Sequence, residues 1–98
     1  ACNTSPRFVR ALLDVSADLK RYLFVLEIGH KLERYTSAIT RKTLLEILRA
    51  TLATMDNPRN LVLETNIDNV LISLLTDDAI SGQVLVINLA GNILLVAA

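Results

Sequence analysis

The sequence predicts a small α/β sandwich, in which a mostly parallel four-stranded sheet of order β-β-α-β-α-β carries its helices on one face. Two features support this prediction. Short runs rich in β-branched and aromatic residues at 22–28, 61–63 and 84–87 are typical of buried strands. Leucines at helical spacing between these runs predict helices. Because strand-helix-strand connections are right-handed, both helices would cover the same face, with the first strand antiparallel at an edge.

Composition predicts one globular domain over residues 1–98. The 98 residues include 10 basic and 10 acidic side chains, so the net charge is zero, and 52% of the residues are hydrophobic. This balance is the opposite of the low hydrophobicity and high net charge of disordered chains. No repeat, linker or low-complexity tract divides the chain. We therefore expect a single core of modest stability.

Charge and cysteine content limit the classes of partner and the cellular compartment that we expect for this chain. A net charge of zero gives no broad basic field for nucleic acid or for anionic lipid, so we expect neither as a partner. The lone Cys2 cannot close an intramolecular disulfide, which favours a cytoplasmic setting. The longest apolar run, 84–98, spans about 15 residues and falls short of the roughly 20 that cross a bilayer. Arg7 and Asp14 interrupt the apolar region that a signal peptide would need.

The first 28 residues are predicted to form a β-hairpin. Apolar residues alternate along 8–15, and a second strand over 22–28 ends at Gly29. Ser16 to Leu19 would supply the turn between the strands.

A single long helix is the alternative for this segment. Ser5 would cap it, Pro6 would occupy its first position, and it would run to about Ile28. Phe8, Leu12, Val15 and Leu19 follow helical spacing, and such a stripe could pair with another copy of the chain.

Two helices and a final segment complete the prediction. The first helix spans 40–55, with its apolar stripe formed by Leu44, Leu45, Leu48, Leu52 and Met55. Asp56-Asn57-Pro58 stops it. The second helix begins at Val70, frays at Thr76 and ends near Ser81-Gly82. The tail over 90–98 is either a returning strand or a short closing helix.

The predicted order of elements resembles the STAS domain, the fold of anti-sigma-factor antagonists. Four segments carry the resemblance: LFVLEIGHKL at 23–32, Thr36-Ser37-Ala38, RNLVLETNID at 59–68, and VLVINLAGN at 84–92. The resemblance implies a non-enzymatic regulatory domain that binds a protein partner, such as a serine kinase of the anti-sigma type.

The resemblance also implies candidate site residues. The family's phosphoacceptor motif, Asp-Ser-Ser-Gly-Leu, corresponds to Leu71-Ile72-Ser73-Leu74-Leu75, so Ser73 is the phosphoacceptor candidate. The candidates for partner binding lie near the starts of the two helices: Asp68, Asn69, Thr36 and Ser37. Because leucines replace the motif's polar residues, we expect the Ser73 hydroxyl to be hydrogen-bonded to a backbone carbonyl inside an apolar helix turn.

The residue pattern contains no catalytic or metal-binding constellation. His30 lacks a neighbouring nucleophile and an orienting acid, and adjacent acids such as Asp77-Asp78 at a helix end are usually solvated. One histidine and one cysteine do not form a zinc site. We therefore expect a non-enzymatic protein without metal or cofactor. The alternatives to a STAS-type function are a helical dimerisation module, with a homodimer as the assembly, and a redesigned α/β scaffold without function.

Overall fold

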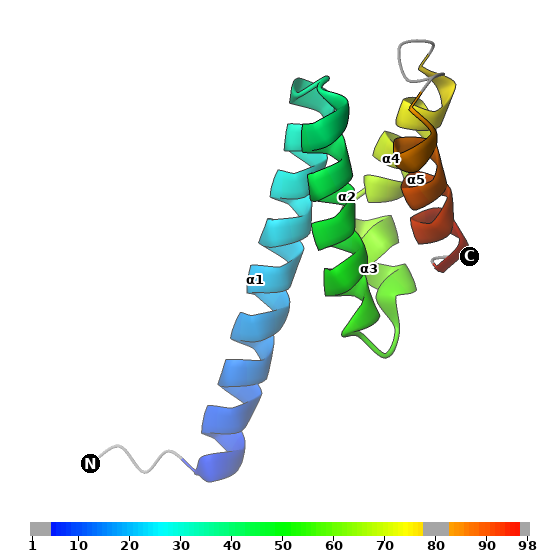
Figure 1. The fold of residues 1–98 in the computed structure, drawn as a ribbon. Coiled ribbons are helices and arrows are strands. Elements are labelled where there is room, and N and C mark those ends of the chain that lie inside the picture. The colour runs from blue at the N-terminus through cyan, green and yellow to red at the C-terminus, as the bar shows by residue number, and fades with distance from the viewer. Residues whose placement is uncertain (1–4, 78–82, 97–98) are drawn as a thin grey trace.

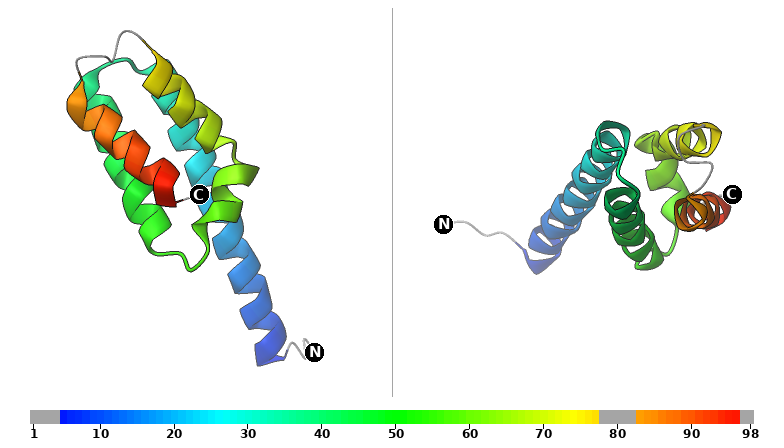
Figure 2. Two further views of the ribbon diagram at one scale, coloured as in Figure 1. Left: turned by 90° about the vertical axis from the view of Figure 1, so that its right-hand side faces the viewer. Right: turned by 45° about the horizontal axis from the view of Figure 1, so that its top comes forward.

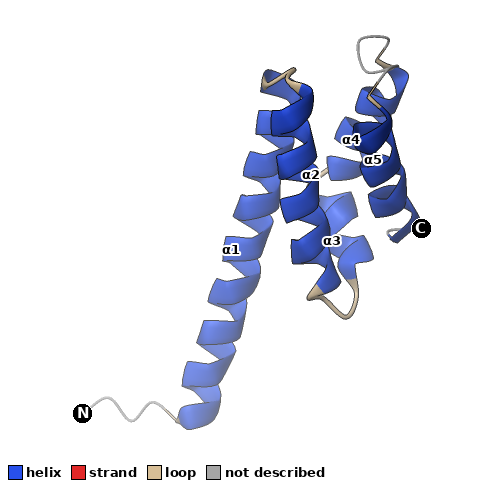
Figure 3. Cartoon of the chain, viewed as in Figure 1, coloured by secondary structure: helices blue, strands red, loops and turns tan. Residues whose placement is uncertain are grey.

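The computed structural model describes residues 5–77 and 83–96, and most of these residues are helical (Figure 1). The helices are α1 (Pro6–Arg34), α2 (Ala38–Ala53), α3 (Pro58–Glu64), α4 (Ile67–Thr76) and α5 (Val84–Val96). No strand occurs in the described part of the chain (Figure 3). The predicted α/β sandwich, and with it the fold that the STAS resemblance implies, is therefore wrong.

The predicted hairpin over 8–28 is replaced by one helix, α1, as the alternative reading proposed. The Phe8 amide donates to the Ser5 side-chain oxygen over 3.2 Å, and Pro6 opens the helix. The segment from Ser16 to Leu19 contains no glycine, proline or asparagine to force a turn, so the helix continues through it. It also passes Gly29 and ends at Arg34, six residues beyond the predicted end.

The predicted strands at 61–63 and 84–87 are also helical. Pro58 not only follows the end of α2 but also occupies the first position of α3, where its missing N–H costs nothing. The run at 84–87 begins α5, whose buried residues Val86, Ala90 and Ile93 recur at helical spacing. Short β-branched runs suit either a buried strand or a buried helix, and packing decides between them.

The two predicted helices are confirmed with shifted ends. The helix expected over 40–55 is α2, and the helix expected from Val70 is α4, which begins three residues earlier at Ile67. Asn66 has a positive φ of 56° and separates α3 from α4. Asparagine tolerates this left-handed conformation better than most residues. The predicted end near Ser81-Gly82 lies outside the described residues.

The core lies between α1, α2, α4 and α5. Helix α5 packs against α2 and α4, α1 packs against the same two helices, and α3 packs against α4. The buried apolar residues come from all five helices: Val25, Ile28, Leu32, Leu45, Leu48, Leu52, Leu61, Val62, Ile67, Leu71, Leu74, Val86, Leu89, Ala90 and Ile93. On α1, all three of these residues lie in the second half of the helix.

The described chain is elongated because α1 extends beyond the other helices (Figure 2). It measures 61 × 24 × 18 Å, and its radius of gyration is 16.2 Å. A compact domain of this length would have a radius of about 13 Å. With 29 residues, α1 alone is about 44 Å long. Its second half is therefore part of a helical body, while its first half projects away from that body.

One buried arginine ties the α1–α2 turn to the end of α4. Arg41 is 4% exposed, and its Nε atom donates to the Tyr35 carbonyl oxygen over 3.0 Å. Its Nη1 atom lies 3.8 Å from Asp77 Oδ2. Because a buried guanidinium needs partners to offset its lost hydration, these contacts hold the three segments together.

Arg41→Ala is expected to lower the free energy of unfolding by about 2–4 kcal/mol, since it leaves the Tyr35 carbonyl without its donor and removes a packed side chain. Arg49→Ala is the matched control, because Arg49 is exposed on the same helix. Its effect should stay within about 0.5 kcal/mol. Urea denaturation of both variants checks this. Equal effects would contradict the tie that we assign to Arg41.

Gly29 and Gly91 are expected to respond oppositely to valine. A Cβ atom on Gly29 would lie 3.0 Å from Cδ1 of buried Ile67, whereas one on Gly91 would meet nothing within 4 Å. Both substitutions gain a few tenths of a kcal/mol of helix propensity. Gly29→Val should nevertheless lose about 1–3 kcal/mol through overpacking. Thermal unfolding should give a lower Tm for Gly29→Val and an unchanged or higher Tm for Gly91→Val.

Candidate interaction site

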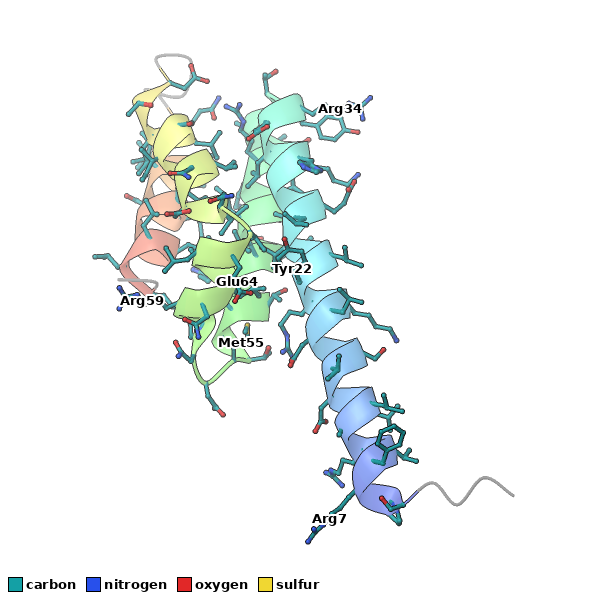
Figure 4. The ribbon with its side chains drawn as sticks, turned by 180° about the vertical axis from the view of Figure 1, so that it is seen from behind. Arg7, Tyr22, Arg34, Met55, Arg59 and Glu64 are labelled. Carbon is teal, nitrogen blue, oxygen red and sulfur yellow. The ribbon has the colours of Figure 1, made fainter. Side chains whose placement is uncertain are left out.

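The first half of α1 presents large apolar side chains to solvent. Phe8 is 56% exposed and Leu12 is 54% exposed, although both residue types usually lie in cores. The same holds along the projecting helix for Val9, Leu13, Val15, Leu19, Leu23 and Phe24. Figure 4 shows the projection: Arg7 lies at its far end, and Tyr22 lies where the helix meets the body near Glu64. Exposed apolar patches are typical of interaction sites, so the projecting half of α1 is the candidate site.

Four of these exposed residues continue into two half-buried ones to form a regular row, which we call the apolar stripe: Phe8, Leu12, Val15, Leu19, Tyr22 and Leu26. Successive members are separated alternately by four and three residues, which is the heptad spacing of a coiled-coil seam. The row extends for about 27 Å along the helix. Its first four members are exposed, while Tyr22 and Leu26 are half-buried where the stripe meets the body.

The apolar stripe is not the face that α1 turns toward its own core. Val25, Ile28 and Leu32 are buried, and at about 100° per residue their face lies roughly a third of a turn away from the stripe. Followed toward the N-terminus, the core-facing side continues as Arg21 and Asp14. The body therefore covers the second half of α1 and has no apolar face to pack against in the first half.

The ion pairs of α1 lie outside the apolar stripe. Arg21 Nη1 lies 3.5 Å from Asp18 Oδ1, and Lys31 Nζ lies 3.4 Å from Glu27 Oε1. Lys31 also lies 6.0 Å from the centre of the Tyr35 ring. Exposed pairs at these spacings add only a few tenths of a kcal/mol each to the helix. They contribute little to its stability, and they leave the stripe itself free of charge.

A polar recess of about 360 Å³ lies at the C-terminal end of the apolar stripe. On α1 it begins at Leu26, the last member of the stripe, and continues through Gly29, His30 and Glu33. The opposite wall comes from α4 and the turn before it: Thr65, Asn66, Asn69, Val70 and Ser73. The stripe and the recess thus form one continuous surface, apolar along the projecting helix and polar beside the body.

The structure brings together only some of the residues that the sequence singled out. Asn69 and Ser73 line the recess together with His30, whereas Thr36 and Ser37 are exposed in the α1–α2 turn and are not part of its lining. Asp68 is half-buried in the first turn of α4, and its Oδ1 atom has no hydrogen-bond partner among the described residues.

The position of Ser73 differs from the one that its neighbouring leucines predicted. It is exposed on α4, and its hydroxyl forms no hydrogen bond within the described part of the chain, in place of the expected bond to a backbone carbonyl. Over residues 5–77 and 83–96, no group of three or more His, Cys, Asp or Glu side chains gathers as a metal site would require. Cys2 and Asp78 lie outside the described residues.

Sequence analysis identified Phe8, Leu12, Val15 and Leu19 as a stripe that could pair with another copy, but only in the alternative, helical interpretation of this segment. The alternation of apolar residues along 8–15 and the heptad spacing that begins at Phe8 involve the same residues. The main prediction relied on the alternation and therefore placed these residues in a strand. Glu33 and Asn66 were missed because only the approach of α4 to α1 places them beside one recess.

Comparison with protein-family models, with curated proteins and with solved structures gives no match. Together with the helical fold, this overturns the STAS resemblance, and the motif argument for Ser73 as a phosphoacceptor loses its basis. No helix within residues 5–77 and 83–96 has both the length and the apolarity that crossing a membrane requires.

Proposed function

We propose that this chain is a helical dimerisation module whose partner is a second copy, bound along the apolar stripe of α1. The observation that carries the proposal is the heptad row of exposed side chains on a helix that its own body leaves uncovered. A second copy supplies a helix with the same spacing, and two such rows interdigitate as knobs into holes.

The stability of the projecting helix supports a partner. Residues 6–20 are exposed except for the half-buried Ser16, and isolated helices of this length are marginal in water. Most helical stability in proteins comes from packing an amphipathic face. A partner on the apolar stripe would supply that packing to both helices at once, so association and helix formation would be coupled.

The residues beside the apolar stripe widen the surface that a partner would cover. Val9 and Leu23 border one side of the row, and Ala11 borders the other. A face of this width matches a helix that packs in a bundle, where three to four positions in every heptad are apolar. Its composition suits a second apolar helix better than a polar ligand.

Leu12→Lys is expected to weaken the dimer at least about 100-fold, because each copy loses the burial of one leucine, worth about 1.5–3 kcal/mol. Leu13→Lys is the matched control: Leu13 is 64% exposed, it lies off the stripe, and lysine and leucine have similar helix propensities. Sedimentation equilibrium over a wide dilution series measures both dissociation constants. The control should dimerise like the unchanged chain.

Two outcomes would reject the proposal. One is an unchanged chain that stays monomeric at all concentrations, and the other is equal weakening by Leu12→Lys and Leu13→Lys. A monomeric chain that co-sediments with vesicles of anionic lipid would assign the apolar stripe to a membrane surface instead, since amphipathic helices with basic residues also bind there.

Amide exchange in residues 9–21 is expected to slow as the protein concentration rises, whereas exchange in 25–33 stays slow throughout. The reason is that only the first segment depends on the partner for its packing. Hydrogen exchange followed by mass spectrometry, at concentrations on either side of the dissociation constant, checks this. Fast exchange in 9–21 at every concentration would contradict coupled association.

A further inference from the structure

We infer that two of the proposed dimers join into a tetramer, in which the projecting halves of four α1 helices form a bundle. The contact between dimers runs along a second row of α1 residues, which we call the second row: Val9, Leu13, Ser16, Lys20 and Leu23. This inference rests on the proposed dimer and adds to it a further, weaker step of association.

The apolar face of the projecting helix is wider than the apolar stripe. Leu13 is 64% exposed and Leu23 is 54% exposed, although neither belongs to the stripe. Together with the exposed Val9 and Phe24, they extend the apolar face over about half of the circumference of the helix. A two-stranded coiled coil covers only a narrow seam, whereas a helix in a larger bundle buries a broader face. A single partner helix would therefore leave much of this apolar surface in water.

The second row has the spacing and the direction of a contact with another helix. Its members are separated alternately by four and three residues, as in the apolar stripe. At about 100° per residue, the second row lies slightly more than a quarter of a turn from the stripe. Each helix of a four-helix bundle contacts two neighbours in directions about a quarter of a turn apart, against about a sixth of a turn in a bundle of three. The angle between the two rows thus matches a bundle of four.

The body of each copy leaves this face free. The residues that hold α1 on the body, Val25, Ile28 and Leu32, lie on the side of the helix opposite the middle of the apolar face. All the other helices lie on that one side of α1 (Figure 1). Toward the N-terminus the same side bears charged residues such as Arg10 and Asp14. Four α1 helices can therefore gather around one axis with their charged sides and their bodies outside the bundle.

The apolar face ends where the body begins. Beyond Leu26, the same side of α1 continues as the exposed residues Glu27, His30 and Arg34. Because charged side chains are costly to bury without partners, these residues mark the end of the bundle. The bundle therefore includes only the projecting half of α1.

The second row provides a weaker contact than the apolar stripe. Ser16 and Lys20 interrupt its apolar members, whereas the stripe contains no charged residue. A lysine at the edge of a contact covers apolar surface with its aliphatic stem and keeps its ammonium group in water, so it permits the contact without adding much to it. We therefore expect dimers at low protein concentration and tetramers at high concentration.

Leu13→Lys separates the two contacts, because Leu13 belongs only to the second row. The substitution is expected to weaken the step from dimer to tetramer at least about 100-fold and to leave the step from monomer to dimer unchanged. Leu12→Lys should weaken both steps, since the tetramer is built from dimers. Sedimentation equilibrium over a wide dilution series of the full chain, under reducing conditions, measures both dissociation constants.

Lys20→Leu is expected to strengthen the step from dimer to tetramer at least about tenfold, because it makes another member of the second row apolar. Arg10→Leu is the matched control. It also replaces an exposed basic residue of the projecting half by leucine, but on the charged side of the helix. Arginine, lysine and leucine have similar helix propensities, so the control should leave both steps unchanged.

The outcomes separate this inference from the proposed dimer. If the unchanged chain stops at the dimer at every concentration, the tetramer fails and the proposed dimer stands. A tetramer that Leu13→Lys leaves intact, or that Arg10→Leu strengthens as much as Lys20→Leu does, would also overturn the inference. A trimer would overturn the angle argument on which it rests. If the unchanged chain is monomeric throughout, the proposed dimer fails, and the tetramer fails with it.

Discussion

The change in polarity along one side of α1 is the constraint on which the rest of the structure depends. From Val25 onward the side of α1 that faces the body is apolar, and α2 and α4 pack against it. Toward the N-terminus the same side bears Arg21 and Asp14, which are costly to bury without partners. The body therefore ends where this side becomes charged, and the first half of α1 continues without it.

The exposed apolar stripe follows from this constraint. A helix has a single axis, so two apolar rows on different sides cannot both face the same neighbours. The row from Phe8 to Leu26 lies roughly a third of a turn from the core-facing side that bears Arg21 and Asp14. In the proposed dimer, the second half of α1 packs against its own chain and the first half packs against the partner.

The recess beside Gly29 lies at the C-terminal end of the apolar stripe, next to the part of α1 that the body covers. Close packing of Ile67 against Gly29 brings α4 near α1, and this approach places Asn69 and Ser73 beside the end of the apolar stripe. The same contact that closes the core thus forms the polar recess at the end of the apolar stripe. Arg41 acts at the other end of the body, where it ties the α1–α2 turn to Asp77.

The sequence by itself determined the elements with unambiguous signals. Leucine spacing predicted α2 and α4, and Ser5 with Pro6 indicated where a first helix would begin. It did not decide between hairpin and helix over 8–28, or between strand and helix at 61–63 and 84–87. Short β-branched runs can be buried equally well in a strand or in a helix. Only the elements that pack against them decide which of these structures forms. Tertiary structure alone decided that Val86, Ala90 and Ile93 face α2 and α4 from a helix, and that the heptad row on α1 stays uncovered.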